Sequence, residues 1–459
     1  MLDLTLKEIA QMAGGQLNKP EYEDIHVDVV SIDTRTISAG EMYMPILGEK
    51  LDGHIFIDMA FEKDAVASFC NIKRRKDFDD YPLVLVEDTN AAFTKLAKNF
   101  RQNVEPIKVI GITGSNGKTT TKDLINLALQ SDFKVAKTIG NLNNEIGVPR
   151  TLLRLDKSTD VGIVEMGTDG FGQIAHLTDI VRPDIAILTN IGDSHLHVLK
   201  TKENVAKEKV DIIKGLDQDG VFIYNYDDPY LRKEVADRQI SQRIITFGQD
   251  EDSDYVITIV KMTNSGSTFK LNGQIYRTSL LGSHNIYNAA VAIIVSQLFH
   301  VDQGLVKRQL EISQSSAMRT ELLNLDGFDL LNDSYKSNPQ SLKSALDTLD
   351  NLSGYKRKIA ILGDMLELGD DEEELHRMIG RYIDPNKIDY LLLTGPLSTF
   401  IAEEASKNFP LGHVFHINKK EDLIDKAKYL IQKNSLVLVK ASRSLRLEEI
   451  VEALELITL

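Results

Sequence analysis

One stretch decides the fold of this chain: Gly111-Ile112-Thr113-Gly114-Ser115-Asn116-Gly117-Lys118-Thr119-Thr120. The apolar run before it starts at Ile107 and carries Lys108 as its one charge, which is typical of a buried parallel strand. The residues after it predict a helix with one apolar face, formed by Leu124, Ile125, Leu127 and Ala128. Strand, glycine turn, Gly-Lys-Thr and helix in this order indicate a loop that binds phosphate groups.

The residue types in this loop suit phosphate chemistry. Glycines let backbone N–H groups close around phosphate oxygens, and the following helix directs its positive end to the same place. Lys118 supplies a positive charge, and the hydroxyl of Thr119 is a ligand for Mg²⁺. The general spacing requires a glycine five residues before Gly117, where this chain has Ile112, so the layout is a variant. The alternative is a plain glycine turn with a surface lysine, which the flanking strand and helix disfavour.

Composition excludes several classes of protein. The apolar content of 42% and the charged content of 26% are ordinary for a globular protein without membrane spans. We see no secretion signal at the N-terminus, and the single cysteine excludes an internal disulfide, so we expect a cytoplasmic protein. The net charge of −15 argues against general nucleic-acid binding. We also expect a monomer.

The order of strand-like and helix-like segments predicts three α/β domains, in agreement with a length of 459 residues at about 150 per domain. Residues 1–105 predict a small α/β domain. Residues 106–318 predict a parallel sheet with helices on both faces, including strands Val161–Met166 and Asp184–Asn190. Residues 319–459 alternate again and predict a Rossmann-like, doubly wound domain without a phosphate loop.

The central domain contains one departure from this alternation. Three predicted strands follow one another without helices between them, and Asn272-Gly273 is a favourable hairpin turn. We therefore expect a small antiparallel insert on the nucleotide-binding domain, formed by Tyr255–Val260, Ser267–Leu271 and Gln274–Leu280.

Polar residues near the ends of the central strands are candidates for metal binding, because ligands in such sheets bind at the carboxyl ends of strands. Glu165 ends one strand and suits Mg²⁺, although a surface glutamate is equally compatible with the sequence. His195 follows the next strand; a lone histidine is more often a loop or core residue than a ligand. Lys209 lies on a predicted helix, where a solvated charged face is the default interpretation.

The segments around the third domain add further candidates. Arg319 lies between two domains, where it could contact a terminal phosphate or form an interdomain salt bridge. Asp333 and Tyr335 follow the first strand of the third domain, and Asn338 with Pro339 has the pattern of a helix start. Helix capping accounts for Asn338 but leaves the two preceding polar residues unexplained.

Taken together, these segments resemble the Mur ligases, ATP-dependent enzymes that add amino acids to the bacterial cell-wall precursor. The resemblance covers essentially the whole chain, and the variant glycine layout is the form that this family uses. It rests on segments in family order: Asp33-Thr34-Arg35, Asp52-Gly53-His54, residues 113–122, residues 141–149, Glu165-Met166-Gly167, residues 282–288, Arg319, residues 332–339 and residues 362–369.

The resemblance implies a specific reaction. The match is closest to the member that joins D-alanyl-D-alanine to UDP-N-acetylmuramoyl-tripeptide, with ATP consumed through an acyl phosphate and ADP and phosphate released. It implies two Mg²⁺ ions, bound by Thr119, Glu165, His195 and a carbamylated lysine, for which Lys209 is the best match. Lys118, Lys209, His195 and Arg319 would be the catalytic residues.

The resemblance also implies binding residues for each substrate. ATP would contact the loop and residues of two later segments: Thr113, Gly114, Ser115, Asn116, Gly117, Lys118, Thr119, Thr120, Asn285, Asn288, Arg319, Asp333 and Tyr335. The precursor would contact Asp33, Thr34 and Arg35 at its uridine end and Asn141, Asn144 and Glu145 at its peptide end, with Asn338 as a further substrate contact. The chain departs from its relatives at Lys336, Ser337 and residues 441–446, near the expected dipeptide pocket.

Two other functions were weighed. One is a sister ligase of the same fold that adds a single third amino acid or polyglutamate. The sister enzyme that adds the diamino acid usually carries Asp-Asn-Pro-Arg, and this chain has Ser337-Asn338-Pro339-Gln340 instead. A nucleotide-binding scaffold without catalysis is disfavoured because all of the predicted metal and phosphate ligands are intact.

Overall fold

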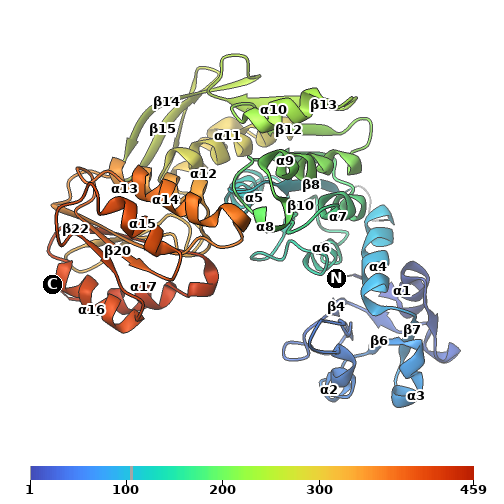
Figure 1. Cartoon of the computed structure of the whole chain (residues 1–459). Helices are drawn as coiled ribbons and strands as arrows, with labels where there is room; N and C mark the ends of the chain where they lie inside the picture. The colour runs from blue at the N-terminus through green and yellow to red at the C-terminus, as the bar shows by residue number, and fades with distance from the viewer. Residues whose placement is uncertain (1, 104–106, 459) are drawn as a thin grey trace.

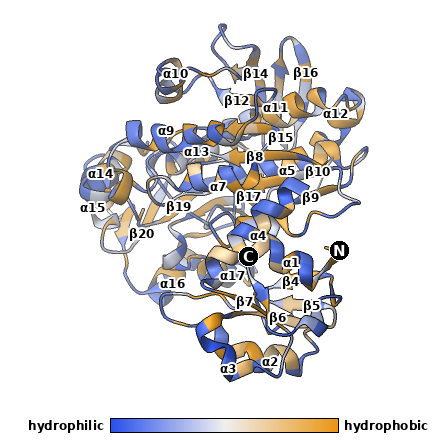
Figure 2. Cartoon of the chain, turned by 90° about the vertical axis from the view of Figure 1, so that its right-hand side faces the viewer, coloured by the Kyte–Doolittle hydropathy of each residue, from blue (hydrophilic) through white to orange (hydrophobic). Residues whose placement is uncertain are grey.

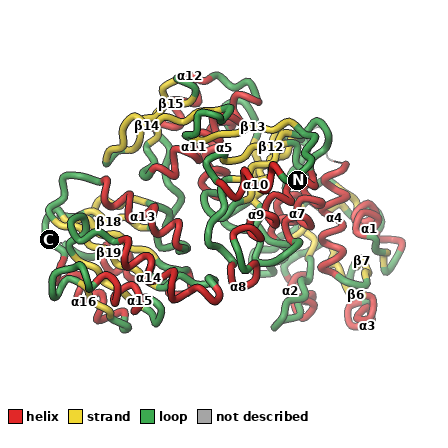
Figure 3. Tube along the Cα trace, turned by 45° about the horizontal axis from the view of Figure 1, so that its top comes forward, coloured by secondary structure: helices red, strands yellow, loops and turns green. Residues whose placement is uncertain are grey.

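The structure is a computed structural model that describes residues 2–103 and 107–458. It contains three α/β domains, each built on its own main sheet, so the predicted fold class is confirmed. The predicted junction between residues 105 and 106 lies outside the described residues. In Figure 1 the first domain (blue) and the third domain (orange to red) lie on opposite sides below the central domain (green to yellow). Figure 3 shows three corresponding groups of strands, each flanked by helices.

The first domain has a five-stranded sheet in the order β2-β7-β6-β5-β4 and a two-stranded ladder of β1 and β3. The apolar spacing of Leu6, Ile9, Ala10 and Ala13 before Gly14-Gly15 predicts a first helix. It is present as α1 (Leu6–Ala13), which Gly14 ends in the left-handed conformation. The long helix α4 (Thr89–Asn103) packs against α1. The remaining elements are β1 (Leu4–Thr5), β2 (Gln16–Leu17), β3 (His26–Val27), β4 (Val29–Ser31), β5 (Glu41–Tyr43), α2 (Ile57–Glu62), β6 (Ala67–Asn71), α3 (Arg75–Phe78) and β7 (Leu83–Val86).

The central domain has a nine-stranded sheet in the order β16-β15-β14-β13-β12-β11-β8-β10-β9. Its strands are β8 (Lys108–Thr113), β9 (Val135–Lys137), β10 (Val161–Glu165), β11 (Ile185–Leu188), β12 (Val221–Asn225), β13 (Arg243–Gly248), β14 (Tyr255–Thr263), β15 (Gly266–Leu271) and β16 (Gln274–Thr278). Its helices are α5 (Lys118–Leu129), α6 (Gly147–Leu152), α7 (Gln173–Val181), α8 (Leu196–Leu199), α9 (Lys202–Val210), α10 (Pro229–Ala236), α11 (Ser283–Leu298) and α12 (Gln303–Glu311).

Apolar side chains on both faces of this sheet explain its helical cover. Along β8, Val109 packs in one apolar cluster, whereas Ile110 and Ile112 pack in the other. Residues of α7 and α9 complete the first cluster, and residues of α5 and α11 complete the second. A strand buried on both faces reads as a continuous apolar run, which is the pattern of β8 and β10 in Figure 2.

The phosphate loop lies where the sheet topology changes direction. The strand β8 pairs in parallel with β10 on one side and with β11 on the other. The chain therefore moves to opposite sides of β8 in successive crossovers, which leaves a crevice at the carboxyl ends of these strands. The loop after β8, Glu165 and the segment after β11 all reach this crevice.

The third domain has a six-stranded sheet in the order β17-β18-β22-β19-β20-β21, parallel except for the pair β17–β18. Apolar clusters cover both of its faces. The strands are β17 (Glu321–Asn324), β18 (Asp329–Asn332), β19 (Arg357–Gly363), β20 (Tyr390–Thr394), β21 (Val414–His416) and β22 (Ser435–Lys440). The helices are α13 (Pro339–Asn351), α14 (Glu372–Tyr382), α15 (Ser398–Ala405), α16 (Lys420–Leu430) and α17 (Glu448–Glu455).

The antiparallel segment of the central domain is present, but it is continuous with the main sheet. Strand β14 pairs in parallel with β13 at its start and then antiparallel with β15. The turn at Asn272 and Gly273 joins β15 to β16 as expected. The sequence reasoning missed β12 and β13, which connect this segment to the phosphate loop. Within the described part of the chain, no helix has the length and apolar character that crossing a membrane would require.

Candidate active site

A cavity of about 1280 Å³ lies at the carboxyl edge of the central sheet and extends to the third domain. Most of the predicted site residues line it: Ser115, Asn116, Gly117, Lys118, Thr119, Thr120, Asn141, Asn144, Glu145, Glu165, His195, Asn285, Asn288, Arg319, Asp333 and Tyr335. Both the central and the third domain therefore contribute walls to one site.

Two glycines of the phosphate loop adopt conformations that other residues would strain. Gly114 has φ +150°, and a Cβ atom there would lie 1.9 Å from Thr189 Oγ1. Gly117 has φ +82°, and its Cβ atom would lie 2.6 Å from Asn288 Oδ1. The loop thus passes close to β11 and α11, and α5 begins directly after it. The N–H groups of Ser115 and Asn116 donate to Asn190, so the backbone N–H groups that can bind an anion are those at the start of α5.

Lys118 is folded back over the loop. Its Nζ donates a hydrogen bond of 2.6 Å to the carbonyl of Gly114. Burial lowers the pKa of Lys118 to about 8, with Lys336 and Arg319 lowering it further and Glu165 opposing them. Several cations therefore converge on one small region, which an anionic ligand would stabilise.

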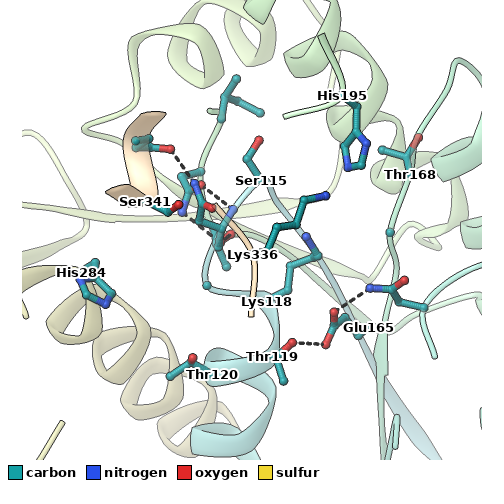
Figure 4. A pocket seen from close by; sticks show the side chains of 18 of the residues that line it. Ser115, Lys118, Thr119, Thr120, Glu165, Thr168, His195, His284, Lys336 and Ser341 are labelled. Atoms are coloured by element: carbon teal, nitrogen blue, oxygen red, sulfur yellow. Dashed lines mark hydrogen bonds between the residues drawn. The ribbon is translucent and has the colours of Figure 1, made fainter. Parts of the chain in front are cut away.

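Glu165 and Thr119 form the oxygen-rich corner of the site. The hydroxyl of Thr119 donates to Glu165 Oε2 at 2.9 Å, and Asn143 Nδ2 donates to the other carboxylate oxygen at 2.8 Å (Figure 4). The buried Lys122 lies 3.8 Å from the same carboxylate and donates to the carbonyls of Thr138 and Gly140. Glu165 is 1% exposed, so it is not the solvated surface residue that the sequence left open.

His195 approaches the site from the segment after β11. It has φ +57° and precedes the short helix α8. Its Nδ1 atom lies 3.1 Å from Glu367 Oε2 of the third domain, at ion-pair distance but without the alignment of a hydrogen bond. Burial lowers the pKa of His195, which favours the neutral imidazole that binds metal ions.

Lys209 lies in the interior and not on a solvated face. Its side chain is 1% exposed, and within the described part of the chain its Nζ has no hydrogen-bond or ion-pair partner. Burial sets its pKa well below the usual value, and Lys118 lowers it further. The neighbouring Glu208 is occupied elsewhere, because its carboxylate accepts the N–H groups of Gly172 and Ile174.

The third domain supplies a second wall of charged and aromatic groups. The Arg319 guanidinium stacks over the Tyr335 ring, 4.0 Å from its centroid. Asp333 accepts a 2.7 Å hydrogen bond from the buried Lys440 and one of 3.0 Å from the backbone N–H of Thr320. These contacts fix the positions of Arg319 and Asp333 on the side of the cavity that faces the phosphate loop.

Asn285 and Asn288 lie on α11, beside the phosphate loop. Asn288 Nδ2 donates to Asn285 Oδ1 at 2.9 Å, and Asn288 Oδ1 accepts from the Thr121 hydroxyl at 3.1 Å. Asn285 Nδ2 donates to the carbonyl of Leu281. The two amides are thus oriented by the fold toward the same part of the cavity.

The remaining predicted residues do not line the cavity: Gly114, Lys209, Thr113, Asn338 and residues 33–35. Thr113 is buried at the end of β8, and Asn338 lies behind the wall, where it caps α13. In the first domain Asp33 and Arg35 form a salt bridge of 2.7 Å at the surface, and the Thr34 hydroxyl contacts Met59. Asp52 and His54, which carried part of the resemblance, bind one another at 2.6 Å.

Two site residues were missed at the sequence level. Lys336 and Glu367 both line the cavity, and their side chains form a salt bridge of 3.0 Å. In the sequence, Lys336 is distinguished only as a departure from related chains. Glu367 follows β19, and its proximity to His195 depends on how two domains pack, which no local pattern reports.

The donor set at Thr119 and Glu165 fits magnesium. Mg²⁺ typically binds to one or two carboxylates together with substrate phosphates and water. Here the Thr119 hydroxyl and the Glu165 carboxylate, 2.9 Å apart beside the phosphate loop, provide the protein ligands. In residues 2–103 and 107–458, no three His, Cys, Asp or Glu side chains converge in a way that could hold a metal ion. A metal here therefore depends on phosphate oxygens as ligands.

Comparison with family models gives three matches in chain order. The Mur ligase family catalytic domain matches residues 26–101, the Mur ligase middle domain matches residues 112–296, and the Mur ligase glutamate ligase domain matches residues 318–443.

Relatives match along the whole chain. The chain is 39% identical to a UDP-N-acetylmuramoyl-tripeptide–D-alanyl-D-alanine ligase of Bacillus subtilis, covering 99% of both chains. It is 33% identical to the enzyme of the same name from Escherichia coli, again covering 99% of both. Among solved structures, MurF from Acinetobacter baumannii superposes with a TM-score of 0.90 at 25% identity, covering 99% of both chains. MurF ligase from Thermotoga maritima in complex with ADP gives 0.81 at 27% identity, covering 94% of this chain and 98% of that one.

Proposed function

The chain belongs to the Mur ligase family, and from this premise we propose that it joins D-alanyl-D-alanine to UDP-N-acetylmuramoyl-tripeptide at the expense of ATP. It is an ATP-dependent ligase that forms an amide bond in peptidoglycan precursor synthesis. One observation is the main support for placing the ligation reaction in this cavity. The Thr119 hydroxyl and the Glu165 carboxylate meet at 2.9 Å beside the phosphate loop, opposite a cationic wall from the third domain.

The reaction has two steps. The terminal carboxylate oxygen of the tripeptide attacks the γ-phosphorus of ATP, a new O–P bond forms, and ADP leaves with the electron pair of the broken bond. The dipeptide amine then attacks the acyl carbon, a C–N bond forms, and phosphate leaves with the electrons of the C–O bond and takes up the proton that the amine loses. Each atom and charge is accounted for without a further reactant.

The main obstacle is electrostatic, because a carboxylate must approach a triphosphate. Lys118 and Arg319 face the same part of the cavity and would offset this repulsion most strongly where charge develops. When bound, Mg²⁺ would polarise the terminal phosphate oxygens, with Thr119 and Glu165 as its protein ligands. The nucleoside would extend toward Asn285, Asn288, Asp333 and Tyr335.

Lys209 is proposed to carry a carbamate. A lysine that is buried without an acceptor and beside other cations is driven to its neutral amine, the form that adds CO₂. The resulting carbamate is an oxygen donor, which fits a second Mg²⁺ shared with His195. The chemistry of the surroundings supports this proposal: two cations lower the pKa of Lys209, and a negative group there would be stabilised by both.

The remaining predicted residues would bind the two ends of the precursor. Asn141, Asn144 and Glu145 line the cavity and would contact the peptide end, whereas residues 33–35 of the first domain would hold the uridine nucleotide. Residues 1–105, 106–318 and 319–459 would then bind the precursor nucleotide, ATP and the incoming dipeptide, respectively. All of these contacts come from one chain, so we expect a monomer, and the use of ATP places the reaction in the cytoplasm.

The test is coupled turnover. Purified protein is incubated with Mg²⁺, ATP and each candidate tripeptide precursor, with and without D-alanyl-D-alanine, while ADP release and product mass are followed. We expect ADP release and a product of added dipeptide mass only when both acceptor and dipeptide are present. Equal ADP release in their absence, or no product of that mass with any precursor, would refute the proposal.

A further inference from the structure

Lys336 extends into the cavity from the loop before α13, in a wall of the third domain that Arg319, Lys440 and Arg443 also line. It lies between Asp333 and Asn338, and its carbonyl accepts a 2.8 Å hydrogen bond from the buried Lys440. That bond holds the backbone in place, so the direction of the side chain is set by the fold. In Figure 4 the Lys336 side chain lies above Lys118 and extends toward His195.

The ammonium group of Lys336 is held and yet accessible. Its Nζ lies 3.0 Å from Glu367 Oε2, and the same carboxylate oxygen lies 3.1 Å from His195 Nδ1. The Lys336 side chain keeps 41% of its surface exposed, although it lines the cavity. A ligand in the cavity can therefore reach this ammonium without displacing protein groups.

Lys336 adds to a surplus of positive charge around the phosphate loop. It lowers the pKa of Lys118, Lys209 and His195, so its charge acts on all three. Three carboxylates oppose this charge, and each is already engaged. Glu208, beside Lys209, accepts the N–H groups of Gly172 and Ile174. Glu165 accepts hydrogen bonds from Thr119 and Asn143, and Glu367 is shared between Lys336 and His195. A further carboxylate that lines the cavity, Asp333, is paired with Lys440.

We propose that Lys336 is a further catalytic residue that contacts the phosphoryl group while it moves from ADP to the precursor carboxylate, with Glu367 as its positioning partner. The inference rests on the proposed function, because it assigns a residue to the first of its two steps. In that step the carboxylate O–P bond forms, the bond between phosphorus and the ADP oxygen breaks, and ADP takes the electron pair. Lys336 donates hydrogen bonds to the equatorial oxygens and transfers no proton.

The arrangement links catalysis to domain closure. Lys118 approaches the phosphates from the loop itself, whereas Lys336 arrives with the third domain and is fixed by a carboxylate that also contacts the central domain. Positive charge over the terminal phosphate is thus complete only when the two domains are docked. A charge delivered in this way favours the transition state over bound ATP alone.

The experiment compares Lys336→Met with Lys336→Arg. The methionine variant keeps the length of the side chain without its charge and should lower kcat by about a hundredfold, with the KM for ATP changed by less than about threefold. The arginine variant keeps the charge and should recover at least about a tenth of the wild-type kcat. Affinity for ADP with aluminium fluoride, a mimic of the transferring phosphoryl group, should fall at least about tenfold in Lys336→Met, while affinity for ADP alone stays unchanged.

Lys343→Met is the matched control, because Lys343 lies on α13 of the same domain, contacts Met378 and Tyr382, and is outside the cavity lining. It should match the wild type in every readout. A wild-type kcat in Lys336→Met, or equal weakening of ADP and ADP–aluminium fluoride, would overturn the proposal, the second by assigning Lys336 to domain structure. A wild-type protein that fails to ligate would refute the proposed function instead, so the two failures are distinct.

Discussion

Three lysines among the described residues are almost fully buried, and their hydrogen-bond partners differ. Lys122 donates to two backbone carbonyls, and Lys440 donates to Asp333 and to a carbonyl. Both are satisfied by the fold. Lys209 is equally buried, and in residues 2–103 and 107–458 its ammonium group has no such acceptor. A buried charge without a partner is costly, so this lysine is stable only when neutral or chemically modified.

Replacing Lys209 by alanine should abolish ligation, because the proposed carbamate and its metal would both be lost. A small carboxylate such as acetate, added at high concentration, should restore part of the activity by occupying the vacated space as an oxygen donor. Product formation measured with and without acetate checks both expectations. The control is Lys207→Ala, which removes an exposed lysine from the same helix and should leave activity unchanged. Full activity of Lys209→Ala without acetate would eliminate the carbamate.

At the scale of elements, Asn338 at the start of α13 has two functions: it caps the helix and it connects the third domain to the central one. Asn338 caps the helix by accepting from the Ser341 N–H, and Ser341 completes a capping box. Its Nδ2 also donates to Asn116 Oδ1 of the phosphate loop at 2.8 Å and to Ser194 Oγ at 3.2 Å. The first helix of the third domain is therefore attached directly to the loop that would bind ATP.

Two substitutions separate these functions. Asn338→Ser keeps a good N-cap oxygen but removes the amide donor, whereas Asn338→Ala removes both. We expect Asn338→Ala to be less stable than Asn338→Ser by about 1 kcal/mol, or about 2–4 °C in the melting transition of the third domain. Both variants should lower kcat to a similar degree, because both lose the bond to Asn116. Differential scanning calorimetry and the ligation assay give the two values. Wild-type kcat in Asn338→Ser would show that the interdomain bond has no part in turnover.

At the scale of the whole molecule, the loop after β19 docks the third domain onto the central one. The Glu367 carbonyl accepts from the His197 N–H at 3.2 Å, and the Glu367 side chain reaches His195. Gly369 follows in the left-handed conformation at φ +73°, where a Cβ atom would lie 3.1 Å from the backbone of His197 and Leu196. The first domain is held separately, through salt bridges such as Lys98 with Asp179 at 2.6 Å.

Gly369→Ala should loosen this docking, because the new methyl group presses against the backbone of α8, which has little room to move. We expect a larger radius of gyration in small-angle X-ray scattering. We also expect kcat to fall by about tenfold or more, because a small displacement of the reacting groups strongly lowers the rate of the reaction. Gly354→Ala is the matched control: its φ of +89° imposes comparable strain, but nothing lies within 4 Å of its Cβ position. Equal scattering and equal kcat in the two variants would contradict the docking role.

Elements with strong local signals were predicted well. The strand of the phosphate loop, the helix after it and the Gly14 helix end follow from apolar spacing and backbone freedom, so β8, α5 and α1 are where the sequence indicated. The apolar, strand-length runs Leu83–Val86 and Tyr390–Thr394 form β7 and β20 with those same bounds. Strands β12 and β13 were missed, because they carry no turn or motif beyond a short apolar run.

The sequence by itself determined the three-domain α/β architecture, the phosphate loop and the family, because each depends on residue types at fixed spacing along the chain. Tertiary structure decided which side chains meet. Only packing shows that Glu165 reaches the Thr119 hydroxyl, that Lys209 is buried without an acceptor, and that Lys336 and Glu367 of the third domain reach His195. The burial of a side chain and the charge around it depend on many residues that are distant in the sequence, so a local sequence pattern cannot predict them.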